Sequence, residues 1–492
     1  APMQTGDGLL VRLRPVAAAL TAEDLLALAA LVRENGNGLI EITARGNIQL
    51  RGLTAETVPR LAEGLAAAGI VPQTGVAIEV PPLSGIDPSE TADATPVAEG
   101  LRKAITVAAL TLAPKLAVVV DGGGVLSLAD MVADIRLDAV TVNGTAAWRL
   151  SVGGDRLTAK TVATLSAGSV VDGAMLTIEA LAAIGPAARG RDLDVATLAS
   201  QLITRPESTS ISHELDVAVS PFSPAGRRWP EGSDEGARTA FNVGATPSSR
   251  CRDLLPEGEK GKEALYLPSG DGVEQEEACF SRRHPLGLHH IGGQAVLGIA
   301  PAYGQVHADR LAALVQALSA RGAMEFRLAP HRTLLVRGLS DETLAEAQAA
   351  AGREKFWCTD TAPGRAVSIC AGASGCASAS FDTHAAADAV VAHAAELLDG
   401  SVDVHISGCP KGCAHPARAA VTLCGTAAGI GLVLDGRAGD TPVSTLPAAD
   451  LIPAIQRLGT LLRARRRENE AAKDLIDRTA PAHFVSAYQG QQ

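Results

Sequence analysis

The chain has 492 residues, of which 47% are hydrophobic and 20% are charged, and its formal net charge at pH 7 is −11. This composition belongs to a globular protein with room for two or three domains. An acidic chain with 3% aromatic residues and no basic stripe excludes nucleic acid as a partner, and the lack of an apolar run of about 18 residues excludes a membrane span.

The first 75 residues predict two strand and helix pairs. Strands are expected at 9–14 and 39–51, and helices at 22–33 and 56–68. The opening Ala-Pro-Met-Gln lacks the basic and apolar regions of a secretory signal, so we expect a cytoplasmic protein with reduced cysteines.

The same order of elements recurs at 296–352, aligned without a gap at an offset of 286 residues, so that Arg51-Gly-Leu meets Arg337-Gly-Leu. A second match, 140–147 against 421–428, has an offset of 281 and six identities in eight positions. Two offsets that differ by five residues indicate one duplicated unit. We therefore predict an α/β (α+β) fold with a pseudo-twofold axis.

Composition separates the duplicated parts from the rest. Residues 206–275 are rich in Pro, Gly, Ser and acidic residues without a sustained period, and they predict a linker. The charged run that begins at Arg466 predicts a helix end and a tail. The expected segments are 1–75, 76–205, 206–275, 276–355, 356–465 and 466–492.

Four of the eight cysteines fall into two glycine-rich loops. Five residues separate Cys370 from Cys376, and three separate Cys409 from Cys413. Four thiolates on two loops can ligate zinc or an iron–sulfur cluster, and the wide first loop favours a [4Fe–4S] cluster over the tighter knuckles of structural zinc. A pair of disulfides is disfavoured by the expected reducing compartment.

The residues between the two loops predict a helix and then a strand. Asp382 or Thr383 can cap the helix, and Gly400 ends it. Its apolar face carries Ala386, Val390, Ala394 and Leu397. Alternating apolar residues at 402, 404 and 406 predict the strand that leads into the second loop. We therefore expect both cysteine loops to converge at one edge of an α/β layer.

The cysteine spacing resembles that of the sulfite and nitrite reductases, which hold a [4Fe–4S] cluster beside siroheme. Within that superfamily, Gly-Cys-Pro-Lys-Gly-Cys-Ala-His-Pro at 408–416 resembles the precorrin-3B synthases more closely, because the reductases usually carry Asn in place of Lys411 and lack the Ala-His pair. The resemblance implies an internally duplicated nitrite/sulfite reductase-like fold. Two ferredoxin-like halves, 1–75 and 276–355, would join an α/β domain at 76–205 and a cluster-binding α/β domain at 356–465.

Cationic residues in the first copy extend this resemblance. Arg12-Leu-Arg14 resembles the Arg-x-Arg segment of the reductases, and the segment around Arg45 resembles their Thr-x-Arg-x-x-x-Gln segment, whose arginine faces tetrapyrrole carboxylates. Arginine suits this role because its planar fork pairs bidentately with a carboxylate. The resemblance implies that these three arginines, with Lys115 and Lys411, bind substrate carboxylates. Solvated arginines on a strand face are the alternative.

Two departures argue against a reductase. Lys115 and Ala117 stand where the sulfite reductases carry two lysines that neutralise the anionic substrate, and Val76 stands where they carry a further arginine. A pocket that lacks two cations is poorly built for sulfite or nitrite. The run Asp121-Gly-Gly-Gly124 lacks the order of a nucleotide-binding loop, so electrons are expected from an external donor.

The resemblance leaves room for a second, mononuclear non-haem iron. Its candidate ligands are His284, His289, His290 and His415, although their spacing identifies no ligand set and a lone histidine is more often structural. Catalytic residues are left unassigned.

The function that the resemblance implies is the oxygen-dependent hydroxylation of precorrin-3A at C20, with closure of a γ-lactone, in cobalamin biosynthesis. Such an enzyme is an iron–sulfur oxidoreductase of the monooxygenase type. It would use a [4Fe–4S] cluster without siroheme, molecular oxygen, and an external electron donor such as NADH or a reductase. The alternatives are a siroheme-dependent sulfite or nitrite reductase and a non-catalytic electron-transfer or zinc-stabilised protein; a plain electron carrier needs no carboxylate clamp.

Overall fold

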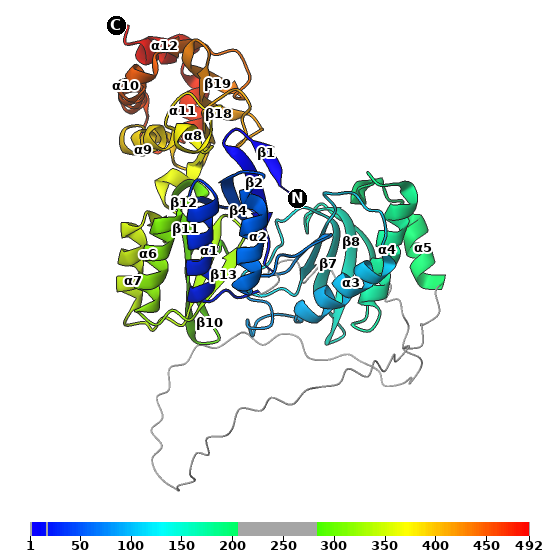
Figure 1. The fold of residues 1–492 in the computed structure, drawn as a ribbon. Helices are drawn as coiled ribbons and strands as arrows, with labels where there is room; N and C mark the ends of the chain where they lie inside the picture. The colour runs from blue at the N-terminus through cyan, green and yellow to red at the C-terminus, as the bar shows by residue number, and fades with distance from the viewer. Residues whose placement is uncertain (1, 16–17, 205–282, 492) are drawn as a thin grey trace, which may run out of the picture.

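The computed structural model describes residues 2–15, 18–204 and 283–491. A C-terminal domain lies above a central pair of half-repeats, and a first α/β domain lies beside them (Figure 1). The predicted linker, 206–275, falls outside the described residues. Among the helices in the described ranges, none is long and apolar enough to cross a membrane.

The two central half-repeats share the order strand, strand, helix, strand, strand, helix, and the second contains two further short strands. The first consists of β1 (Met3–Thr5), β2 (Gly8–Leu13), α1 (Ala22–Asn35), β3 (Leu39–Ile42), β4 (Ile48–Leu53) and α2 (Thr57–Ala67). The second consists of β10 (Gly287–Ile291), β11 (Gln294–Pro301), β12 (Gln305–His307), α6 (Ala308–Ser319), β13 (Glu325–Ala329), β14 (Thr333–Arg337), α7 (Leu344–Arg353) and β15 (Phe356–Trp357). The single strand expected at 39–51 was wrong: Gly46, at φ +72°, lies in the turn that splits this segment into β3 and β4.

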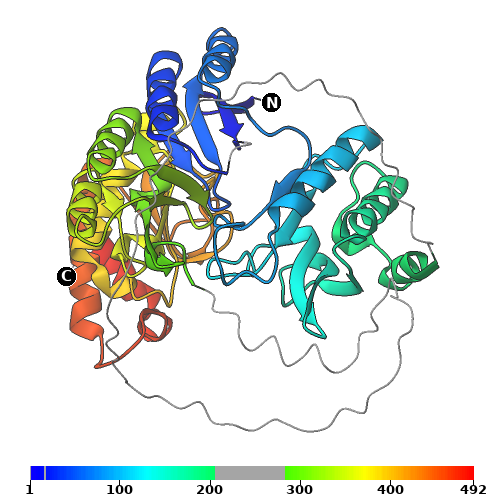
Figure 2. The same cartoon turned by 90° about the horizontal axis from the view of Figure 1, so that it is seen from below.

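Helix α1 shows why these sequences form an outer layer of helices. Thr21 Oγ1 accepts a hydrogen bond from the backbone N–H of Asp24, and the Asp24 carboxylate accepts one from the N–H of Thr21, which together make a capping box. Leu25, Leu28 and Val32 follow at helical spacing and are buried in a core shared with α6. Figures 1 and 2 show α1, α2, α6 and α7 on the outer side of the two sheets, so the inner faces remain available for a site.

Strand pairing between the half-repeats confirms the duplication. The sheets have the equivalent orders β1-β2-β4-β3-β12 and β10-β11-β14-β13. Val306 of β12 pairs with Ile40 of β3, and Leu20 forms a bridge with Phe326 of β13. At the offset of 286 residues, Leu20 corresponds to Val306 and Ile40 corresponds to Phe326. The two pairings are therefore equivalent, with the two copies exchanged. Each half-repeat therefore completes the sheet of the other, as a pseudo-twofold axis requires.

The two α/β domains share one sheet topology. The first contains β5 (Ala77–Glu79), α3 (Thr95–Ala108), β6 (Ala117–Asp121), β7 (Ala133–Val142), β8 (Thr145–Gly154), β9 (Lys160–Leu165), α4 (Val170–Ile184) and α5 (Val195–Thr204). The C-terminal domain contains β16 (Val367–Ile369), α8 (Gly372–Gly375), α9 (Thr383–His393), β17 (Val404–Ser407), β18 (Ala419–Thr426), β19 (Gly429–Gly436), β20 (Ser444–Leu446), α10 (Leu451–Arg465), α11 (Ala472–Arg478) and α12 (Pro481–Gln489). In both sheets the first three strands are parallel and the last two are antiparallel.

Two expectations for the C-terminal domain need correction. Asp382 caps α9 as predicted, but the helix ends at His393, well before Gly400. Helix α10 crosses at this end so closely that a side chain at Gly459 would collide with the His393 carbonyl. Residues 466–491 contain α11 and α12 where a tail was expected. Tyr488 of α12 is buried, and its hydroxyl donates to the carbonyl of Ile430 at 3.1 Å. This segment is therefore part of the domain.

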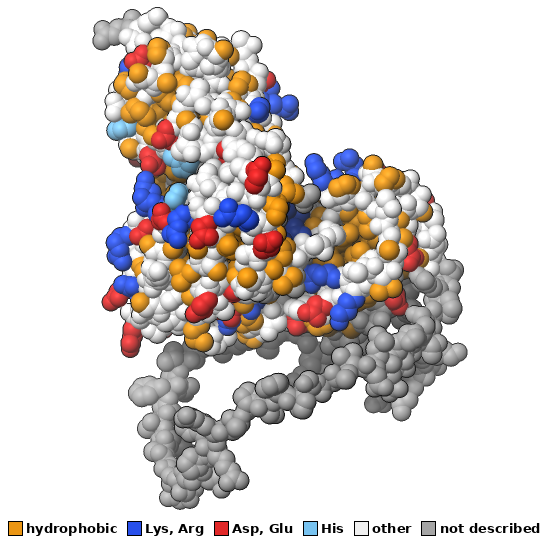
Figure 3. Space-filling model, in the orientation of Figure 1, with side chains coloured by type: hydrophobic (Ala, Val, Ile, Leu, Met, Phe, Trp, Pro, Cys, Tyr) orange, Lys and Arg blue, Asp and Glu red, His pale blue; other side chains and the backbone are white. Residues whose placement is uncertain are grey.

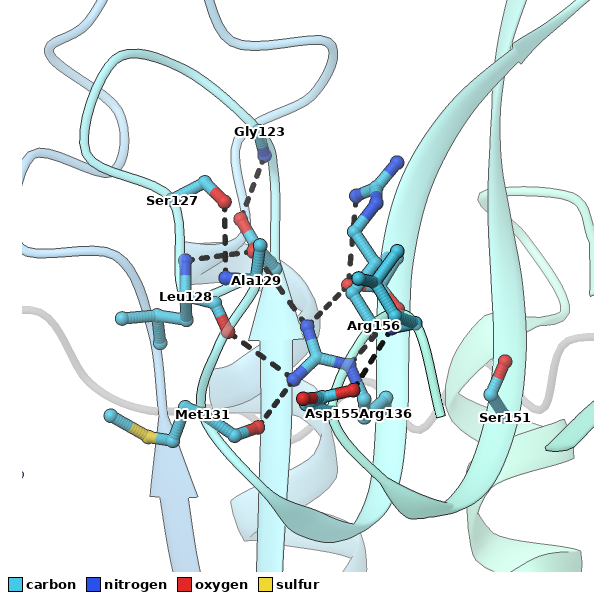
Figure 4. Close-up of polar contacts among 12 residues, drawn as sticks. Gly123, Ser127, Leu128, Ala129, Met131, Arg136, Ser151, Asp155 and Arg156 are labelled. Carbon is cyan, nitrogen blue, oxygen red and sulfur yellow. Dashed lines mark hydrogen bonds and ion pairs between the residues drawn. The ribbon is translucent and has the colours of Figure 1, made fainter. Parts of the chain in front are cut away.

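A buried charge network fixes the loop 122–132 of the first α/β domain (Figure 4). Arg136, which is fully buried, pairs with Asp138 at 2.7 Å and donates to the carbonyls of Leu128 and Met131 at 3.2 and 2.6 Å. Asp121 accepts hydrogen bonds from the backbone N–H groups of Gly123 and Leu128 at 3.0 and 2.8 Å. Arg136 and Asp121 thus fix the backbone of this loop, which extends toward the inner face of the half-repeats.

Candidate metal and tetrapyrrole site

Both cysteine loops leave the same end of two parallel strands. Cys370 follows β16 directly, and Cys409 stands two residues after β17. These strands are parallel neighbours in register, with Ile369 opposite Ile406. Because the carboxyl ends of parallel neighbours lie together, the two loops converge, as the sequence predicted.

Short contacts hold the loops together. The N–H of Gly408 donates to Cys370 Sγ at 3.1 Å, and the Thr383 hydroxyl donates to the Cys370 carbonyl at 2.7 Å. A side chain at Gly408 would collide with Ala379, so glycine is what allows the two loops to approach.

All four thiols line one cavity of about 520 Å³. The pKa of the Cys413 thiol is raised by burial and by its neighbours Cys409, Cys370 and Cys376, while Lys411 opposes this shift. The other three thiols thus lie close enough to Cys413 to affect its pKa.

The donor set of the cavity is four thiols. Four thiolates can hold structural zinc as well as an iron–sulfur cluster. Soft thiolates around a cavity are the ligands of iron–sulfur clusters.

The N-terminal hairpin β1–β2 covers the cavity. Residues 3–6 line it, and the carbonyl of Gly6 accepts a hydrogen bond from the N–H of Ala377 at 3.0 Å. A Cβ at Gly6 would collide with Cys376 Sγ. The first copy therefore closes a site whose thiols all come from the second.

Basic side chains gather in the same cavity. It is lined by Arg12, Arg51, Arg332 and Lys411 and by one carboxylate, Glu41. Figure 3 shows the surface hollowed between the C-terminal and first α/β domains, with basic side chains on its walls.

The four cations differ in how far they are neutralised. Arg51 pairs with Asp7 at 2.9 Å and with Glu41 at 3.4 Å. Lys411 is exposed, and its Nζ donates to Ser378 Oγ at 3.2 Å. A ligand carboxylate would compete with two protein carboxylates for Arg51, but only with a hydroxyl for Lys411.

Arg14 and Arg45 lie in a second cavity, of about 320 Å³, between the first half-repeat and the first α/β domain. Arg14 pairs with Glu79 at 2.7 Å, and Arg45 donates to the carbonyl of Val132 at 2.7 Å. The segment 43–46 contributes to both cavities, so they adjoin along the inner face of the sheet. Lys115, by contrast, is exposed in the loop before β6 and lines neither cavity.

The candidate histidines are not brought together. His284 contacts His331 with ring centroids 4.7 Å apart, and burial with the nearby Arg365 lowers its pKa to about 4. His289 bonds to the Pro285 carbonyl, His290 faces Asp341, and His415 bonds to the Arg418 carbonyl. No ligand set for a second iron emerges among the described residues.

Two residues escaped the sequence analysis. Arg332 corresponds to Gly46 at the offset of 286 residues, and the comparison of the copies considered only cations of the first. Arg332 has φ +64°, an uncommon conformation for an arginine. His405 was assigned only to a strand, yet it is fully buried beside the second cysteine loop, where burial and then His415 lower its pKa to about 4.

Comparisons with known proteins first identify the fold and the class of protein to which the chain is similar. Residues 1–68 match the nitrite/sulfite reductase ferredoxin-like half domain. The structure of the NirA protein of Mycobacterium tuberculosis matches with a TM-score of 0.61 over 97% of this chain and 84% of that one, at 17% identity, and thus shares the fold. The duplicated nitrite/sulfite reductase-like fold is confirmed.

Sequence relatives then narrow the class. A precorrin-3B synthase of Sinorhizobium sp is 39% identical over 491 residues, which cover 99% of this chain and 93% of the relative. A ferredoxin–nitrite reductase of Synechococcus elongatus is 23% identical over 432 residues, which cover 85% of this chain and 76% of that enzyme. The chain belongs to the precorrin-3B synthase family and is an enzyme of the oxidoreductase type.

Proposed function

We propose that the protein is a precorrin-3B synthase, which hydroxylates precorrin-3A at C20 and closes a γ-lactone in aerobic cobalamin biosynthesis. The observation that carries this proposal is the 39% identity to a relative of that name along 99% of the chain. A cavity that combines four thiols with four cations supports it, because the substrate is a tetrapyrrole with a rim of carboxylates.

Cys370, Cys376, Cys409 and Cys413 would hold a [4Fe–4S] cluster, which supplies electron transfer at the substrate cavity. Replacing any of them by Ser should abolish or severely reduce cluster content, since a hydroxyl is a poor substitute for a thiolate. Cys358 is the matched control, because it does not line the cavity and burial raises the pKa of its thiol to about 11. About two moles each of iron and sulfide per chain, or stoichiometric zinc, would contradict the cubane.

The two adjoining cavities offer a place for the substrate. Arg12, Arg332 and Lys411 lie at the cluster end, and Arg14 and Arg45 lie at the other. A macrocycle that spans both cavities would find cations for carboxylates on opposite sides of its rim, and arginine would hold them bidentately. Lys115 was a further predicted contact, and its exposed position offers no support for that role.

The siroheme-dependent reductase is the alternative. Ala117 is buried within β6, so no cation from this position reaches a cavity. We expect purified protein to lack siroheme and to require an external donor, NADH or a reductase. A mononuclear iron stays without assigned ligands.

The test is the product formed from precorrin-3A with reductant, in the presence and absence of oxygen. One atom of O₂ should enter the substrate, and the other should leave as water with two electrons from the donor and two protons. Mass spectrometry should find a product heavier by one oxygen, formed only aerobically and lost in the Cys413→Ser variant. Intense Soret absorption together with turnover of nitrite or sulfite would favour the reductase.

A further inference from the structure

A third cavity, of about 170 Å³, lies between the second half-repeat and the C-terminal domain. Its walls come from the end of β11, from the turn between β13 and β14, and from the residues around the start of β16. It shares Ala44 and Arg332 with the thiol cavity, so the two cavities adjoin. Because it is much smaller than the thiol cavity, it has room for one side arm of a ligand that occupies the thiol cavity.

Two arginines without a carboxylate partner line this third cavity. Arg332 donates to the carbonyl of Tyr303 at 3.4 Å. Arg365 donates to the carbonyl of Asp360 at 2.6 Å, and its Nη2 lies 2.6 Å from Nε2 of His284. Within the described ranges, neither guanidinium forms an ion pair with an Asp or Glu side chain, and burial lowers the pKa of both. A bound anion would offset the unfavourable burial of these charges.

The carboxylates in the surroundings do not supply that anion. Three of them bond to other groups: Glu41 to Arg51 at 3.4 Å, Asp130 to His331 at 3.0 Å, and Asp388 to the Tyr303 hydroxyl at 2.9 Å. The carboxylate of Asp360 attracts Arg365 without forming an ion pair, and Asp360 is exposed. The positive charge of the cavity is therefore left for a ligand.

The internal duplication shows that this charge is particular to the second copy. The third cavity is the counterpart of the cavity of about 320 Å³, because equivalent segments at the offset of 286 residues line the two, namely 300–301 and 331–332 in one and 14–15 and 45–46 in the other. In the first copy Glu79, the last residue of β5, pairs with Arg14. The last residue of β16, the equivalent first strand of the C-terminal sheet, is Ile369, so this carboxylate has no counterpart.

The backbone around the third cavity is strained. Three of its lining residues have positive φ although they are not glycine: Tyr303 at +59°, His331 at +58° and Arg332 at +64°. Such strain is uncommon and tends to gather at binding sites. A side chain at Gly304 would collide with Arg332 Nη1, so this glycine makes room for the guanidinium between the two cavities.

We propose that the third cavity is a carboxylate subsite, which receives one acid side chain of a tetrapyrrole bound in the thiol cavity and pairs it with Arg365 and Arg332. The inference rests on the proposed function, which supplies a substrate with a rim of carboxylates. The planar fork of an arginine suits a carboxylate, and the Ser368 hydroxyl on the cavity wall is a further donor.

The experiment measures the binding of precorrin-3A in the absence of oxygen, so that no product forms. Arg365→Met, which removes one cation, and Ser368→Leu, which fills the cavity, should each weaken binding by about ten- to a hundredfold. Arg365→Lys should restore part of it. Because both changes act on one subsite, the double variant should bind no more weakly than the weaker single variant.

Two controls separate the subsite from the rest of the molecule. Iron and sulfide content should stay at the wild-type level, because neither Arg365 nor Ser368 lines the thiol cavity. Arg310→Met should bind precorrin-3A as wild type does, since Arg310 is an exposed arginine on α6 of the same half-repeat.

Each outcome decides the matter. Normal binding by Arg365→Met overturns the subsite, and so do losses that add in the double variant, because they would show that the two changes act separately. If Arg365→Met does not fold, Ser368→Leu decides: weaker binding supports the subsite, and normal binding overturns it. Wild-type protein that does not bind precorrin-3A overturns the proposed function as well, whereas equal binding by wild type and Arg365→Met overturns the subsite alone.

Discussion

Arg14 Nη2 lies 2.7 Å from Glu79 Oε1, and this pair joins the segment directly after β2 of the first half-repeat to β5 of the first α/β domain. Burial raises the pKa of the Glu79 carboxyl, and Arg14 is the main group opposing that shift. A residue that the sequence predicted to bind substrate thus already has a carboxylate partner. A substrate carboxylate would have to share this arginine with Glu79.

Replacing Arg14 by Ala should therefore affect stability as well as binding. The largely buried Glu79 would lose its partner, and we expect the free energy of unfolding to fall by about 1 to 3 kcal/mol, less than for a fully buried pair. Denaturation in urea measures the loss, and the double variant Arg14→Met with Glu79→Gln should recover part of it. An Arg14→Ala variant as stable as wild type would show that the pair contributes nothing.

Arg45 offers the cleaner test of substrate binding. Its side chain is exposed and donates to a backbone carbonyl, so Arg45→Ala should leave the free energy of unfolding and the iron content unchanged. Binding of precorrin-3A should weaken by roughly 1.5 to 3 kcal/mol, the range for a hydrogen bond to a charged group. Arg45→Lys should restore only part, because a point charge cannot reproduce bidentate geometry. Normal binding by the Ala variant would place Arg45 on a solvated face.

Gly6 links the N-terminal hairpin to cluster assembly. A Cβ at this position would collide with Cys376 Sγ, so Gly6→Ala must push the hairpin or the first cysteine loop away. We expect lower iron and sulfide content per chain with the fold retained. Gly352→Ala, on α7, is the matched control, because its new methyl group would meet no atom within 4 Å. Full cluster content in the Gly6 variant would mean that the two segments separate easily.

Glu90 should make stability depend on pH. Burial, aided by Asp93 and Asp87, raises its pKa from 4.5 to about 7 against a hydrogen bond from the Gly85 N–H. Because the folded pKa exceeds the unfolded one, this contribution is fully present below pH 4.5 and is lost as the pH rises through 7. Glu90→Gln should remove this slope, so its stability relative to wild type should increase between pH 5 and 8 by about 1 to 2 kcal/mol, allowing for solvent screening. Parallel curves of unfolding free energy against pH would contradict the shift.

Arg136 should be the most sensitive of these charges to substitution. Arg136→Met would leave Asp138 and Asp121 buried without their shared cation and should cost about 3 to 5 kcal/mol. Hydrogen exchange should quicken in the loop 122–132, which Arg136 holds through two carbonyls. Arg191→Met is the matched control: this arginine is 80% exposed, lies 3.9 Å from Asp192, and should change stability by less than about 0.5 kcal/mol.

The sequence predicted features that depend on local chemistry. The glycine-flanked cysteines predicted the thiol site, and the alignment of the two copies predicted the duplication, because both are patterns that can be recognised along the sequence. The split of 39–51 into a hairpin was missed, since one glycine at positive φ decides it. The packing of α12 was missed because the charges that begin at Arg466 outweighed the later apolar spacing of Phe484 and Tyr488.

The contents of the cavities depend on contacts between distant segments, which one sequence does not reveal. Arg12 lies on β2 and Arg14 lies directly after its end, yet they line different cavities, because separate domains cover the two ends of the sheet. Arg332 enters the thiol cavity from a turn of the other half-repeat. Whether a conspicuous cation such as Lys115 reaches a cavity is likewise decided by the domain arrangement.

The exchanged strand pairing, Val306 with Ile40 and Leu20 with Phe326, also has a historical consequence. A chain of only one half-repeat would leave the outer edge of its sheet unpaired, and a second copy would be the natural partner for that edge. An ancestral subunit with one half-repeat would thus be expected to associate as a homodimer. Fusion turned this association into an intramolecular one, independent of protein concentration. Identical subunits must carry every mutation twice, whereas fused copies can differ, and this freedom allowed the four thiols to be kept by one copy and the hairpin that covers them by the other.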